Sequence, residues 1–124
     1  FDVFNQNYIG LVDKETSLGP VNAHGVLLIN LVSELDRPQI IGSNLHISQG
    51  GIEISDEKWD DNAKVLTINL NDLYGRKGNI FVHVPSSVSP LEPDKIGAQM
   101  SNEGEIMKVP VTLKEKTSLK IPFK

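Results

Sequence analysis

The sequence predicts an all-β domain made of two packed antiparallel sheets, a β-sandwich of the Greek-key or immunoglobulin-like kind with eight or nine strands. Apolar and polar residues alternate with a period of two along the chain, and no stretch keeps a 3.6-residue period over three turns. Gly and Pro recur between the alternating stretches, at the intervals that turns have in sandwiches. Since 124 residues is the size of one domain, we expect a single domain over residues 1–124.

Four strands are expected before the middle of the chain. Branched or alternating apolar residues place them at 1–4, 8–12, 26–32 and 40–43. The stretch 26–32 is apolar on both faces, which is typical of a strand that is covered on both sides. We therefore expect this strand to be central, either between the two sheets or against a neighbouring domain.

A hairpin follows and is the clearest unit of the sequence. Residues 52–59 and 65–70 read as strands, and the polar residues 60–63 between them read as a turn. One face of the second strand is apolar, with Leu66, Ile68 and Leu70 in alternate positions.

Three further strands are expected at 79–85, 107–113 and 119–123. In the first of these, Ile80, Val82 and Val84 should face the core, with Phe81 and His83 on the opposite side. The last two contain Pro110 and Pro122, which predict sheet-edge positions because proline cannot donate to a ladder of hydrogen bonds.

The charge and composition of the chain limit the classes of partner that we expect it to bind. The formal net charge is −4, and it divides into −7 for residues 1–62 (three Lys and Arg against ten Asp and Glu) and +3 for residues 63–124 (nine against six). The lysines of the second half are scattered and are not interleaved with aromatic residues, so we expect no nucleic-acid partner. The longest apolar run is residues 26–29, far short of a membrane span, so no membrane partner is expected.

The sequence contains no recognisable motif for catalysis, for cofactor binding or for metal binding. A catalytic (β/α)₈ barrel needs about 250 residues, twice what is present. The sequence has no cysteine, no Gly-x-Ser-x-Gly turn and no phosphate loop. The acidic residues Asp56, Glu57, Asp60 and Asp61 lack the alternation of a calcium loop, and the three histidines are widely separated. We predict no catalytic residue, no cofactor and no metal site.

The segment 46–51 is the most distinctive in the chain. Its paired glycines permit backbone conformations that a β-carbon disfavours, and the neighbouring polar side chains can satisfy backbone groups left unpaired by a bend. We predict a structural role for four of its residues: His46, Gln49, Gly50 and Gly51.

Aromatic residues are few. A sugar-binding platform usually presents an exposed aromatic ring. In this chain, the candidates for such a contact are Trp59 and Tyr74. A lone Trp in a small sandwich is more often a core residue, so Trp59 is expected to be largely buried.

Two stretches resemble the C-terminal region of bacterial α-galactosidase-like (melibiase-type) glycoside hydrolases. Residues 2–10 and 19–28 are similar to the sequence of that family at the point where the chain leaves the catalytic barrel. Phe4 stands in place of a Trp of the family, and Asn22 stands in place of a Pro. Residues 37–54 resemble the family's Pro-apolar-apolar-Gly-Ser-x-x-His-Ile-Ser-Gln-Gly run. The resemblance covers about two thirds of the chain, and residues after Pro90 match only as generic strands.

The resemblance implies a non-catalytic β-sandwich domain that buttresses the catalytic barrel of an α-galactosidase-like enzyme, which would be its partner in the same chain. Because the sequence begins with neither Met nor a targeting segment, we interpret it as an accessory domain excised from a larger glycosidase. A secreted or periplasmic location is slightly favoured if the parent degrades polysaccharides. Two alternatives stay open: an autonomous carbohydrate-binding module, and an immunoglobulin-like spacer or adhesion module of a cell-surface protein.

Overall fold

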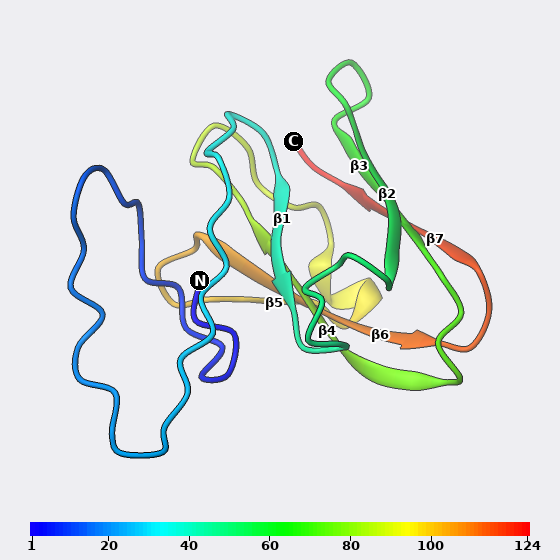
Figure 1. Cartoon of the computed structure of the whole chain (residues 1–124). Coiled ribbons are helices and arrows are strands. Elements are labelled where there is room, and N and C mark those ends of the chain that lie inside the picture. The colour runs from blue at the N-terminus through cyan, green and yellow to red at the C-terminus, as the bar shows by residue number, and fades with distance from the viewer.

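A computed structural model describes all 124 residues and contains two antiparallel sheets, so the chain is all-β with a single short 3₁₀ helix. Figure 1 shows the two sheets at the centre and right of the view, with the N-terminal part of the chain looping away from them. The elements, in order, are β1 (Gln39–Ser43), β2 (Ile54–Asp60), β3 (Val65–Leu70), β4 (Arg76–His83), η1 (Pro93–Ile96), β5 (Gln99–Met100), β6 (Ile106–Leu113) and β7 (Thr117–Pro122). No helix has the length and apolarity that crossing a membrane would require.

The strands form a four-stranded sheet in the order β1-β4-β6-β5 and a three-stranded sheet in the order β2-β3-β7. The expected hairpin is present as β2 and β3, with Trp59 opposite Leu66. Pro122 lies on β7, at the edge of its sheet. Pro110 lies on β6, which is an inner strand, but the two residues of β5 pair only with Met107 and Lys108 and leave that side of Pro110 free.

The main core lies between the two sheets and contains the alternating residues that the sequence predicts. Ile80, Val82 and Val84 face it, because successive side chains of a strand point to opposite sides of the sheet. Thirteen buried residues form this cluster: Leu45, Leu66, Ile68, Leu70, Ile80, Val82, Val84, Ala98, Met107, Val109, Leu113, Ile121 and Phe123.

A second, smaller core covers the outer face of the four-stranded sheet. Phe81 points to this face and is nearly fully buried, since the N-terminal residues Phe1 and Val3 pack over it together with Ile41 and Ile106. The rings of Phe1 and Phe81 are 4.7 Å apart between centroids. The first residues of the chain thus belong to the folded body of the domain.

Three of the expected strands are wrong, and the chain has seven strands where eight or nine were expected. Residues 1–4, 8–12 and 26–32 form turns and irregular structure, with only isolated bridges of Asp2 to Asn7 and to Ile29. The stretch 26–32 is also not central, since the side chain of Val26 is 74% exposed and that of Leu31 is 73% exposed. Period and apolarity show that a strand is possible, but a strand also needs a ladder of backbone hydrogen bonds to a neighbour. This stretch is joined to the first residues and to β1 only by single bonds, such as Asn30 Nδ2 to Ile41 O.

Residues 9–35 form an extended, irregular segment, which we call the arm. Its inner end is held by backbone hydrogen bonds to the first residues of the chain, including Val3 N to Leu28 O at 2.9 Å and Asn30 N to Phe1 O at 2.9 Å. Side chains rather than a ladder join it to β1: Asn30 Nδ2 donates to Ile41 O, and Gln39 Nε2 donates to Ser33 O. The outer part of the arm loops into solvent (Figure 1).

Candidate functional site

The arm and the four-stranded sheet enclose a hollow that is the largest candidate binding surface we describe. It consists of two adjoining spaces of about 850 and 470 Å³ that share Phe1, Tyr8, Ile9 and Gly10 in their walls. We call the two together the Tyr8 groove. Its larger part lies between the arm and β1, and its smaller part lies between residues 6–10 and the segment that joins β5 to β6.

The walls of the larger part are mainly apolar. Arm residues on both sides of the space contribute Leu11, Val12, Leu31 and Val32, and β1 contributes Ile41. Tyr8 stands where the two parts meet, with its ring 5.9 Å from that of His83. Such a wall of aliphatic and aromatic groups is the usual lining of a binding cleft.

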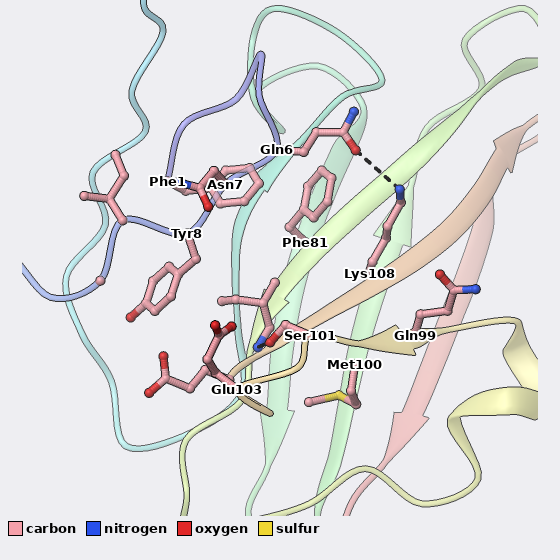
Figure 2. Close-up of a pocket in the computed structure, with 14 residues that line it drawn as sticks. Phe1, Gln6, Asn7, Tyr8, Phe81, Gln99, Met100, Ser101, Glu103 and Lys108 are labelled. Carbon is pink, nitrogen blue, oxygen red and sulfur yellow. Dashed lines mark hydrogen bonds between the residues drawn. The ribbon is translucent and has the colours of Figure 1, made fainter. Parts of the chain in front are cut away.

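The charged side chains of the groove are mostly acidic. Asp13 and Glu34 line the larger part, and Glu103 and Glu105 line the smaller part. None of the four carboxylates forms an ion pair or a side-chain hydrogen bond within the chain. Figure 2 shows Tyr8 and Glu103 among the residues around the smaller part.

The one lysine or arginine in the lining is Lys108, whose Nζ donates to Gln6 Oε1 at 3.4 Å (Figure 2). The groove therefore has a negative potential, which acts on Tyr8. Burial raises the pKa of the Tyr8 hydroxyl, and the charges of Glu105 and Glu34 raise it further. That hydroxyl stays protonated at neutral pH and is free to donate a hydrogen bond.

The chemistry of the groove is that of binding. Apolar walls with a few carboxylates and the hydroxyls of Tyr8, Thr16 and Ser101 can hold a ligand by burial and charge. No group of three or more His, Cys, Asp or Glu side chains in the chain is placed to hold a metal ion. Sequence reasoning did not find this groove, because Tyr8, Glu34 and Glu105 are far apart in sequence and meet only through the irregular arm.

The segment 46–51 forms a tight turn between β1 and β2 in which Gly50 has a φ of +102°. Gly51 does not have a positive φ, whereas Gln49, which carries a side chain, does at +54°. His46 Nδ1 accepts from the backbone N–H of Ser48 at 3.1 Å. Gln49 Oε1 accepts from Ser43 N at 3.2 Å, so both polar side chains satisfy backbone donors of the bend.

The centre of this turn is Glu53, a residue that the sequence reasoning missed. Its carboxylate is fully buried and accepts hydrogen bonds from the hydroxyls of Ser43 and Ser48, from Gly50 N at 2.9 Å and from Ile52 N at 3.4 Å. Burial alone would raise the pKa of Glu53, but these hydrogen bonds outweigh it and hold the pKa below its ordinary value. No local signal marked it, because an acid that alternates with Ile52 and Ile54 is the pattern of the exposed face of a strand.

The two aromatic candidates for sugar contact lie outside the groove. Trp59 is half-buried rather than largely buried: its ring packs edge-on against Phe123 at 5.7 Å, and its indole N–H donates to Asp61 at the surface. Tyr74 is fully exposed in the turn between β3 and β4 and has a φ of +56°. Neither residue lines the Tyr8 groove.

Comparison with protein-family models, with curated proteins and with solved structures finds no match to this chain. The groove and the arm therefore have to be interpreted from their own geometry.

Proposed function

We propose that this chain is a non-catalytic accessory β-sandwich domain that packs against a neighbouring catalytic domain through the arm. The observation that carries the proposal is the exposure of apolar side chains along the arm. Eight large apolar residues of this segment are exposed: Leu11, Val12, Leu18, Val21, Val26, Leu31, Val32 and Leu35.

Exposure on this scale points to a docking surface. Burying one Val or Leu side chain contributes about 1.5 to 3 kcal/mol, so covering even half of these residues would strongly favour association. Single exposed apolar residues are ordinary, whereas a run of them along one segment is typical of an interaction site. Most of the backbone between residues 9 and 27 has no intrachain hydrogen bond, so a partner could also satisfy these groups.

The nature of the partner comes from the sequence resemblance. Residues 37–54 resemble the C-terminal domain of α-galactosidase-like glycoside hydrolases, so we propose that the neighbour is the catalytic barrel of such an enzyme. The carboxylates that hydrolyse the glycoside would then lie in the barrel. For this chain alone, we expect no release of nitrophenol from nitrophenyl α-galactoside.

Hydrogen exchange tests the docking. Residues 1–124 would be measured alone and as part of the longer protein. We expect amides of residues 11–27 to exchange within seconds in the domain alone and at least a hundredfold more slowly in the longer protein. The amides of β3 serve as the internal control and should be protected in both. Equal, fast exchange of the arm in both proteins would refute the proposal.

A carbohydrate-binding module is the second candidate, and the full exposure of Tyr74 is the observation that favours it. An exposed ring can stack on a pyranose. Titration with galactose or an α-galactoside should then shift the NMR signals of Tyr74, and Tyr74→Ala should abolish binding while Trp59→Phe leaves it unchanged. No shift at millimolar sugar would exclude this candidate.

A further inference from the structure

We propose that the Tyr8 groove receives an apolar segment of the partner that carries Arg or Lys beside its apolar side chains. The inference rests on the proposed docking of the arm and adds the chemistry of the surface that it meets.

The groove has space for side chains of a partner. Its larger part, of about 850 Å³, is enclosed by Leu11, Leu31, Val32 and Ile41, which do not fill it. Protein interiors are close-packed, and a space of this size leaves many dispersion contacts unmade. Apolar side chains from outside would restore these contacts, and the exposed arm residues continue the same surface beyond the rim.

Charge decides which apolar segment fits best. Asp13, Glu34, Glu103 and Glu105 have no cationic partner within the chain, and against them stands only Lys108. With four acids against one lysine, the side chains of the lining carry a formal charge of −3. A basic group entering the groove would be attracted, whereas an acidic one would be repelled as it lost water.

Tyr8 favours a cation at the same place. Its ring lies where the two parts of the groove meet, and two carboxylates, Glu34 and Glu105, are near enough to act on its hydroxyl. A guanidinium can stack on such a ring and bind a carboxylate in the plane of its N–H groups. We therefore expect Arg to be preferred over Lys.

A second copy of this chain fits less well. Only one of its unpaired lysines, Lys14, lies on the arm, whereas four lie near the other end of the sequence, at Lys114, Lys116, Lys120 and Lys124. Contact between that region and the groove of another copy would be head-to-tail and would build open chains of molecules.

Two synthetic peptides test the inference. Both have eight residues with Leu and Val at alternate positions, and the other positions are Arg in one and Glu in its match. Each is titrated into the ¹⁵N-labelled chain at low salt. We expect the Arg peptide to shift the amides of residues 8–13, 31–34 and 101–106, and to bind at least tenfold more tightly than the Glu peptide.

Variants locate the charge effect. Glu34→Gln with Glu105→Gln should weaken the Arg peptide at least threefold and reduce the dependence of its affinity on salt. The matched control, Asp94→Asn with Glu115→Gln, removes two exposed, unpaired carboxylates outside the groove and should change the affinity by less than 1.5-fold.

The outcomes separate the two proposals. Equal binding of both peptides in the groove would overturn the charge preference and leave the docking of the arm standing. Binding of neither peptide would overturn the present inference, while hydrogen exchange in the longer protein decides the docking independently. Sugar-induced shifts at Tyr8 in place of peptide shifts, or a concentration-dependent dimer that buries the groove, would likewise overturn it.

Discussion

Replacing the buried carboxylate of Glu53 should destabilise the domain in a pH-dependent way. Glu53→Gln keeps the size of the side chain and removes its charge. Three close donors then lose a charged acceptor: the hydroxyls of Ser43 and Ser48 and the N–H of Gly50. A hydrogen bond to a charged group contributes about 1 kcal/mol more than a neutral one, so the loss amounts to about 3 kcal/mol before desolvation is considered.

Desolvation offsets part of this loss, because the amide is cheaper to bury than the carboxylate. The pKa of Glu53 nevertheless lies below its ordinary value of 4.5, which means that folding favours the charged form overall. We therefore expect Glu53→Gln to lower the free energy of unfolding by about 1 to 3 kcal/mol at neutral pH.

The sign of the pH dependence follows from the lowered pKa. The contribution of a carboxylate whose pKa falls on folding is present above its unfolded-state pKa and is lost as the pH falls through its folded-state pKa. The difference between the wild type and Glu53→Gln should accordingly be greatest above about pH 5.5 and shrink in acid. Urea unfolding near pH 7 and near pH 3 measures both effects.

Glu103→Gln is the matched control, since Glu103 is exposed and makes no hydrogen bond with its side chain. It should change the free energy of unfolding by less than about 0.5 kcal/mol. A Glu53→Gln protein as stable as the wild type at neutral pH, or one whose deficit persists unchanged in acid, would refute the reasoning.

Two further predictions concern the turn and the arm. Gly50→Val should lower the free energy of unfolding by about 2 to 4 kcal/mol, because the φ of Gly50 is +102° and a Cβ there would lie 3.1 Å from Ile54 Cδ1. Gly51→Ala should lower it clearly less, because the φ of Gly51 is not positive. Thermal unfolding followed by circular dichroism compares the two variants, and equal losses would contradict the assignment of strain to Gly50. Leu31→Asp should change the free energy of unfolding of the domain alone by less than about 0.5 kcal/mol, because Leu31 is exposed. Leu66→Ala should lower it by about 2 to 5 kcal/mol, because Leu66 is buried in the core. An arm variant as damaging as the core variant would mean that the arm is folded against the domain.

The sequence predicted the sheets well because their information is local. The alternation of Ile80, Val82 and Val84 with Phe81 assigns opposite faces of β4, and both faces prove to be buried, by the other sheet on one side and by the N-terminal residues on the other. The turn at Gly50 was also predictable, since glycine permits the positive φ that other residues rarely adopt.

The groove could not be predicted in the same way. Its walls combine the arm with residues near positions 40, 83 and 105, and no local period encodes that meeting. Glu53 shows a related limit, because an acid that alternates with apolar residues predicts an exposed side chain. Its partners Ser43 and Ser48 are identified only once the turn has folded back.

The stretch 26–32 is where local pattern and observed structure disagree most, and the disagreement has a physical reading. Apolarity on both faces describes a segment that loses contact with water on both sides. Within this chain, one side of the stretch reaches only the first residues and the edge of β1, through bonds such as Asn30 Nδ2 to Ile41 O, and the other side is open. In the isolated domain, Val26 and Leu31 are therefore exposed to water, which is unfavourable for apolar side chains. This exposure ends only when another surface covers them. If the arm docks as proposed, the longer protein should protect these residues from exchange without any change in β3.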